Sequence, residues 1–130
     1  MPVNDRDRDV VGHILRYCRQ VETAHEDFGS SRERFDRSTT YQNAVSMCIL
    51  QIGELVGHLS EPFKQEHDAI PWHKIRGMRN YVAHEYGTID LEVVWYVATV
   101  SIAELTQFCV DYLKEVERNR WQCEPPHMIK

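Results

Sequence analysis

The segment Ile70-Pro-Trp-His-Lys-Ile-Arg-Gly-Met-Arg-Asn-Tyr-Val-Ala-His-Glu-Tyr-Gly-Thr-Ile-Asp90 contains the densest cluster of chemically active side chains in the sequence. Pro71 suits the first turn of a helix, because that turn does not use the missing N–H. Gly87 can end the helix in the left-handed conformation. We therefore predict a helix between Pro71 and Gly87, held in place by the other helices of the chain.

Two stripes of side chains follow this predicted helix, because positions three and four apart share a face. The polar stripe consists of His73, Arg76, Asn80 and His84, and the mostly apolar stripe consists of Trp72, Ile75, Arg79, Val82 and Tyr86. Asn80 lies four positions before His84 and is placed to hydrogen-bond it. Arg79 and His84 are five apart and project roughly 140° from each other on a regular helix. They can meet if the helix loosens, if Arg79 curls around, or if two copies of the helix face each other.

Cap residues and apolar periodicity predict the remaining helices. Asn4 can cap a first helix that stops near Gly29, and Ser38 or Thr39 can open a second that ends at Glu61-Pro62. Asp90 can cap a last long helix that frays near Arg120.

The connecting segments and the chain end complete this prediction. Residues 30–37 are polar and are expected to form a loop, and 63–67 a short helical turn. The alternation typical of strands is absent. The prediction is one all-α domain over 1–122, followed by a flexible tail over 123–130.

Composition limits the possible functions. The chain has 130 residues, 42% of them apolar, enough for one domain with a core. Its net charge of −5 argues against broad, unspecific binding of nucleic acid. A local positive island remains, because 64–84 contains four Lys or Arg against two acids. The alternative interpretation is that these basic residues simply form a solvated surface without a ligand.

No metal or cofactor is expected. The four cysteines form no C-x-x-C pair, so reduced thiols are expected. Glu54 and His58 lie four apart but have no evident third ligand. The charged N-terminus does not resemble a signal peptide, and no apolar run approaches the length needed to cross a membrane, which favours a cytoplasmic protein.

The run Arg79-Asn80-Tyr81-Val82-Ala83-His84-Glu85-Tyr86 resembles the R-x4-H-x-Y motif of the HEPN superfamily, in particular of the HepT-like ribonuclease toxins from MNT/HEPN toxin–antitoxin pairs. Gln51-Ile-Gly-Glu54 is similar to that family's Ile-Gly-Glu segment. The segments on either side of the motif also agree, so the similarity extends over residues 5–118.

This resemblance implies an up-and-down bundle of four to five helices that forms a homodimer, with two motifs meeting in a cleft. The implied activity is metal-independent endoribonuclease cleavage of RNA. The implied partner is an MNT nucleotidyltransferase antitoxin, which in this family can transfer AMP to the tyrosine that corresponds to Tyr86.

RNA cleavage without a metal needs proton transfer and positive charge beside the phosphorane, which histidine and arginine can supply. We therefore expect Arg79 and His84 to be catalytic, with Asn80 orienting the imidazole or holding a phosphate. The substrate-binding residues would be Arg76, His73 and Lys74. Glu54 is expected either to make a structural hydrogen bond or to contact the catalytic residues without touching the substrate.

Other interpretations of these residues remain open. Arg79 could pair with Glu54 or Glu85, and Tyr86 could be packing at a helix end. The histidines expected at the surface are His13, His25, His58, His67 and His127, and the tryptophans expected in the core are Trp72 and Trp95. The whole chain could also be a catalytically silent HEPN module that binds nucleotide or a partner protein, or a purely structural helical dimer.

Overall fold

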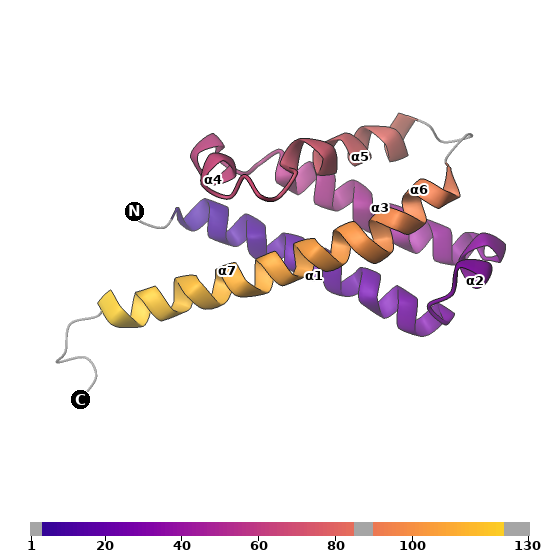
Figure 1. The fold of residues 1–130 in the computed structure, drawn as a ribbon, viewed down its shortest axis with the longest axis horizontal. Helices are drawn as coiled ribbons and strands as arrows, with labels where there is room; N and C mark the ends of the chain where they lie inside the picture. The colour runs from indigo at the N-terminus through magenta and orange to yellow at the C-terminus, as the bar shows by residue number, and fades with distance from the viewer. Residues whose placement is uncertain (1–3, 85–89, 124–130) are drawn as a thin grey trace.

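The computed structural model describes residues 4–84 and 90–123, with side chains described over 4–80 and 90–120. The elements in chain order are α1 (Asp5–Phe28), α2 (Arg32–Arg37), α3 (Thr39–Val56), α4 (Glu61–Glu66), α5 (Trp72–His84), α6 (Leu91–Tyr96), η1 (Val97–Ser101) and α7 (Ile102–Cys123). A π-helical turn, η1, joins α6 and α7 into one rod (Figure 1). No strand occurs in the described residues, and the all-α prediction is confirmed.

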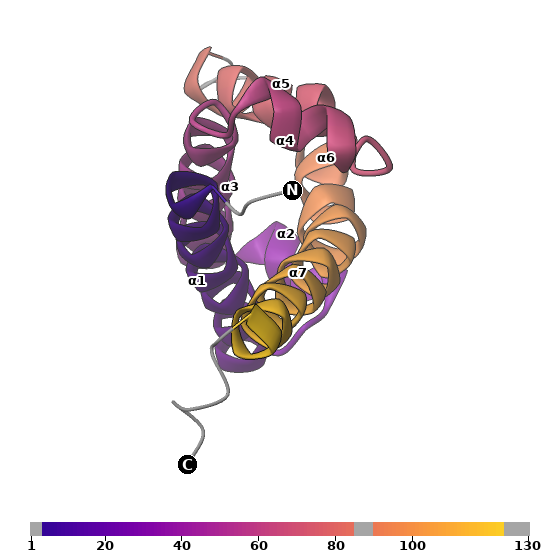
Figure 2. The same ribbon diagram turned by 90° about the vertical axis from the view of Figure 1, so that its left-hand side faces the viewer.

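Four long elements form the bundle: α1, α3, α5 and the α6–η1–α7 rod, with consecutive elements running in opposite directions (Figure 1). The first helix, α1, packs against both α3 and α7, and α5 packs against α3. Viewed from the end, α5 and α4 lie across the top, between α3 on one side and α6 on the other (Figure 2). The predicted up-and-down bundle is therefore confirmed, and α5 keeps one face at the surface.

Most of the predicted helix ends agree with the structure, but α3 ends at Val56, before the break expected at Glu61-Pro62, and these two residues instead open α4. Asn4 caps α1 by accepting a hydrogen bond from the Asp7 N–H at 3.1 Å, and Gly29 ends it with φ of 97°. Ser38 caps α3, and Asp90 caps α6 by accepting from the Glu92 N–H. The last helix continues to Cys123, slightly beyond the predicted end, and most of the predicted tail over 123–130 lies outside the described residues.

The expected loop over 30–37 is wrong, because this segment contains the short helix α2. The Ser31 hydroxyl accepts the Arg34 N–H and caps it. Phe35 is fully buried and packs edge-on against Tyr41. One apolar side chain among seven polar ones thus attaches the segment to the core, a contact that local polarity does not predict.

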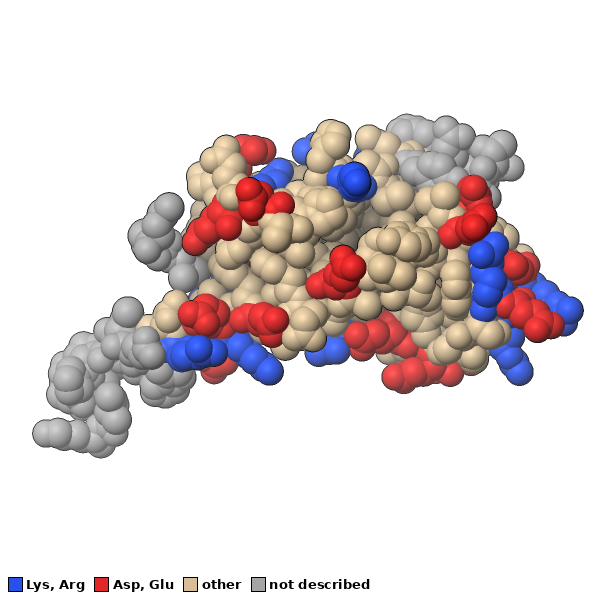
Figure 3. Space-filling view, in the orientation of Figure 1, with Lys and Arg blue, Asp and Glu red and all other residues tan. Residues whose placement is uncertain are grey.

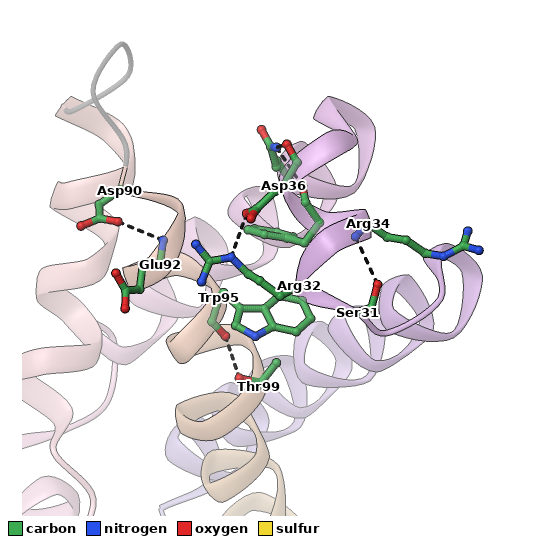
Figure 4. A network of polar contacts seen from close by, with 10 residues as sticks. Ser31, Arg32, Arg34, Asp36, Asp90, Glu92, Trp95 and Thr99 are labelled. Carbon is green, nitrogen blue, oxygen red and sulfur yellow. Dashed lines mark hydrogen bonds and ion pairs between the residues drawn. The ribbon is translucent and has the colours of Figure 1, made fainter.

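An ion pair within α2 lies beside the start of α6. The Nε of Arg32 donates to Asp36 Oδ1 at 2.8 Å, and this hydrogen bond raises the pKa of Arg32, with a smaller contribution from nearby Glu92. Figure 4 shows Arg32 and Asp36 facing Glu92 and Trp95 of α6. The Arg32 guanidinium therefore lies close enough to the acidic start of α6 to interact with the charges of Glu92 and Asp90.

Two histidines that were expected at the surface are partly buried in aromatic clusters. His25 Nε2 donates to the Ala98 carbonyl at 3.2 Å, so its Nδ1 must accept the hydrogen of the Tyr41 hydroxyl. Ala98 belongs to the π-helical turn, and His25 therefore links that turn to α1 and α3. His67 contacts the rings of Phe63 and Tyr112. The two hydrogen bonds of His25 offset the cost of removing its ring nitrogens from water.

The rod from Leu91 to Arg120 is more apolar than we expected. By length and composition alone it could cross a membrane, which corrects the expectation that no apolar run approaches that length. In the structure, its residues Val94, Ala98 and Leu105 are buried in the bundle core. A third of its apolar window is buried, so much of its apolar surface has no cover within the described residues.

The cysteines of the core are reduced, as predicted. Cys18, Cys48 and Cys109 are buried and free. Burial raises the pKa of the Cys18 thiol to about 11 and shifts those of Cys48 and Cys109 in the same direction. These thiols behave as small apolar groups of the core, and Cys123 lies outside the described side chains.

Candidate functional site

The motif helix α5 is anchored at its first residue. Trp72 is buried, and its indole Nε1 donates to the His67 carbonyl at 3.0 Å. Ile75 and Met78 pack against the core along the same side of the helix. Trp72 is therefore a core residue, as expected, whereas Trp95 is partly buried and packs against the core.

A glycine on α3 lets α5 approach closely. A Cβ placed on Gly53 would lie 2.3 Å from the Cβ of Arg79 and 3.2 Å from its Cα. A Cβ placed on Gly57, one turn later, would lie 3.4 Å from the guanidinium carbon of Arg76. Only a residue without a side chain fits at Gly53, so the two helix backbones are in direct contact where Arg79 begins.

Arg79 is held from two sides. Its Nε donates to the Glu54 carboxylate, and its Nη1 donates to Asn80 Oδ1 at 2.8 Å. The two charged side chains are 38% and 45% exposed, so this ion pair lies at the surface and is open to solvent. The interpretation of Arg79 as an ion-pair partner of Glu54 is thus observed, and Glu85 lies outside the described residues.

The expected hydrogen bond between Asn80 and His84 stays a prediction. Asn80 Oδ1 instead accepts from Arg79. His84 is the last residue of α5, but its side chain and the whole of Tyr86 lie outside the described set. The structure therefore gives the position of the helix that carries the motif and of its arginine.

The expected substrate-binding residues lie on two flanks of α5. His73 and Arg76 are exposed, and Arg76 lies over Gly57 near the carboxyl end of α3. Lys74 lies on the opposite flank, where it borders a cleft toward α7. The structure therefore groups Arg76 with Arg79 and Asn80, and it separates Lys74 from them.

Part of the positive charge in the segment 64–84 is neutralised by ion pairs. Lys64 pairs with Glu61 and Arg79 pairs with Glu54. Arg76 and Lys74 have no ion-pair partner among the side chains described here. The same part of the chain has no group of three His, Cys, Asp or Glu residues arranged to hold a metal ion.

An apolar cleft of about 220 Å³ lies between α5 and the α6–η1–α7 rod. Ile75 and Met78 line it from α5, and Val97 and Leu105 line it from the rod. Figure 3 shows this face as largely uncharged between α5 and α7. The sequence did not predict the cleft, although the last helix was apolar enough to face both the core and a neighbour.

Exposed apolar side chains continue this face along α6 and η1. Val93 is 38% exposed, Tyr96 59% and Val100 37%. Their spacing of three and four residues places them in one stripe of the rod. This stripe and the adjacent cleft form an apolar surface that no described residue covers.

A protein-family model described as "Ribonuclease HepT-like" matches residues 14–111 of the chain. A provisionally named RNase from Caldanaerobacter subterraneus subsp. tengcongensis is 29% identical over 108 residues, which cover 83% of this chain and 95% of that protein. A probable ribonuclease HepT from Thermococcus cleftensis is 31% identical over 54% of this chain and 62% of its own length.

A third relative is longer than this chain. It comes from Methanocaldococcus jannaschii and is named a gamma-glutamylcyclotransferase and, provisionally, an RNase. It is 27% identical over 85% of this chain, and the match covers 49% of that protein. A search of solved structures gave no match.

Proposed function

The chain belongs to the ribonuclease HepT-like family, and on this premise we propose that it is a metal-independent endoribonuclease toxin that cleaves cellular RNA in the cytoplasm. The observation that carries the proposal is the arginine that α5 presents at the surface, held by Glu54 and Asn80. This arginine is the first residue of the R-x4-H segment, whose last residue is His84.

The proposed chemistry divides the work between arginine and histidine. One histidine removes the proton of the 2′-hydroxyl, which attacks the adjacent phosphorus, and a second protonates the 5′-oxygen that leaves. Arg79 stabilises the negative charge of the phosphorane through its N–H groups. The products are a 2′,3′-cyclic phosphate and a 5′-hydroxyl, and Arg76 and His73 contact neighbouring phosphates.

We propose that the protein acts as a homodimer, since a second copy supplies the second His84. The five-residue spacing from Arg79 to His84 supports this, because the two side chains of one regular helix point apart. The apolar stripe of Val93, Tyr96 and Val100 also supports it, as a surface that association would remove from water.

We further propose regulation by an MNT nucleotidyltransferase antitoxin that attaches AMP to Tyr86. The added phosphate would compete with RNA for Arg79 and Arg76 through its negative charge. Intact mass after co-expression with such an enzyme tests this proposal. A gain of one or more AMP units that disappears in Tyr86→Phe supports it, and neutralisation without a mass change indicates inhibition by complex formation alone.

Cleavage assays on purified variants test the ribonuclease proposal itself. Arg79→Ala and His84→Ala are expected to abolish RNA cleavage and growth inhibition while keeping the helical circular dichroism spectrum. Arg37→Ala and His13→Ala are matched controls, because each makes the same change at an exposed position away from α5. Normal cleavage by the α5 variants would indicate a catalytically silent module instead.

A further inference from the structure

The guanidinium of Arg79 has used only part of its hydrogen-bonding capacity. Arginine has five N–H groups, of which Glu54 takes the one on Nε and Asn80 takes one on Nη1. The second N–H of Nη1 and both N–H groups of Nη2 have no partner among the side chains described here. These groups form the outer edge of the fork, which is the edge that can bind a phosphate in a bidentate manner.

The contact at Gly53 explains why Glu54 can take this position. The backbone of α5 lies directly against α3 at Gly53, where an added Cβ would be 3.2 Å from both the Cα and the N of Arg79. The Arg79 side chain therefore starts beside Gly53, and the next residue of α3 is Glu54. Gly53 thus allows α5 to approach α3, and the adjacent Glu54 supplies the carboxylate that accepts from Arg79.

We propose that Glu54 is a positioning residue, which holds the inner edge of the Arg79 guanidinium so that its outer edge faces a phosphate of RNA. This inference rests on the proposed ribonuclease function. An exposed arginine without such a partner samples many rotamers, and the loss of that freedom opposes phosphate binding. Glu54 and Asn80 restrict the side chain before RNA arrives, and Glu54 does so through Nε, which leaves the outer edge free.

The opposite role is also physically possible and predicts the opposite result. A carboxylate beside the binding arginine repels RNA phosphates and competes with them for its N–H groups. If that effect dominated, removing the charge of Glu54 would strengthen RNA binding. Because the Glu54 carboxylate is 45% exposed, solvent screens its charge, and we expect positioning to have the larger effect.

Fluorescence anisotropy with a labelled, mixed-sequence 2′-O-methyl RNA 12-mer tests this inference without any cleavage. Glu54→Ala is expected to weaken binding roughly tenfold, as for the loss of one good phosphate contact. Glu54→Gln should stay close to wild type, because its amide oxygen still accepts the Nε–H. Glu33→Ala is the matched control, because it removes the same charge from a surface ion pair on α2.

A double variant separates positioning from a general structural effect. Glu54→Ala should weaken binding no further once Arg79 is alanine, because it acts through that side chain. An additive loss, unchanged binding by Glu54→Ala, or tighter binding by Glu54→Gln would each overturn the inference. If Arg79→Ala itself binds the RNA as well as wild type, the proposed phosphate role of Arg79 fails, and with it the basis for this inference.

Discussion

The position of Arg79 depends directly on the absence of a side chain at Gly53. Substitution by alanine would put a methyl group 2.3 Å from the Cβ of Arg79, whereas ordinary van der Waals contact begins at 3.4 Å. Both groups are attached directly to helix backbone and cannot rotate away. The two helices therefore have to separate by about 1 Å, in an interior that packs without spare volume.

The net cost of Gly53→Ala follows from two opposing terms. Overpacking in a well-packed contact costs about 1–3 kcal/mol. Alanine in a helix interior is favoured over glycine by about 0.5–1 kcal/mol. We expect a net loss of about 1–2 kcal/mol, which lowers the urea midpoint by roughly 0.5–1 M for a domain of this size. The displacement of α5 should also lower RNA cleavage, because Arg79 moves with it.

Two other glycines provide matched controls. A Cβ on Gly12 or Gly77 would have nothing within 4 Å among the described atoms, so alanine at either position should stabilise the fold by about 0.5–1 kcal/mol. Urea unfolding followed by circular dichroism at 222 nm measures all three variants in one experiment. If Gly53→Ala were as stable as Gly77→Ala, the result would contradict a close contact between α3 and α5 at Gly53.

Three further predictions concern the core and the apolar face. Tyr41→Phe should destabilise the protein by about 1–3 kcal/mol in urea unfolding, because the partly buried His25 Nδ1 loses its donor. Tyr112→Phe, whose hydroxyl makes no hydrogen bond among the described residues, should cost much less, and equal effects of the two substitutions would contradict the assigned network. Burial raises the pKa of Cys18 from 9.0 to about 11, so the neutral thiol stabilises the folded state by about 3 kcal/mol below pH 9, and this stabilisation is lost between pH 9 and 11. Cys18→Ala should flatten this part of the curve of unfolding free energy against pH, and an unchanged slope would contradict the raised pKa of Cys18. Tyr96→Glu should convert a dimer to a monomer in light scattering at micromolar concentration while Tyr96→Phe stays dimeric, and a Tyr96→Glu dimer would exclude this face as the interface.

Local sequence signals predicted the starts of three helices and the end of α1 correctly. Asn4, Ser38 and Asp90 each have a short polar side chain that accepts a backbone N–H at the first turn, and this chemistry requires only neighbours in sequence. Gly29 ended α1 for the equally local reason that glycine adopts positive φ without strain. The fold class followed, because four amphipathic helices joined by short connections leave few alternatives.

Contacts between distant residues were the part that the sequence could not predict. Phe35 buries itself against Tyr41 across a helix boundary, and His25 finds an acceptor in Ala98, 73 positions away. Neither partner can be read from periodicity.

In the candidate site, too, local features were predicted and contacts between distant residues were not. The stripe of His73, Arg76 and Asn80 was predicted from helical spacing, whereas the choice of Glu54 as the partner of Arg79 depends on how α3 and α5 pack. Gly53, a glycine in the interior of a helix, was the sequence signal that could have indicated this close approach.

The central claim is that Arg79 and His84 cleave RNA by attack of the 2′-hydroxyl, and the chemistry of the product ends tests it most directly. Purified protein should be incubated with a defined RNA in EDTA, and the fragments analysed by mass spectrometry. The account predicts cleavage with 2′,3′-cyclic phosphate and 5′-hydroxyl ends, and no cleavage at any position where a 2′-O-methyl group replaces the hydroxyl. Fragments with 3′-hydroxyl and 5′-phosphate ends, or cleavage that stops in EDTA, would contradict it.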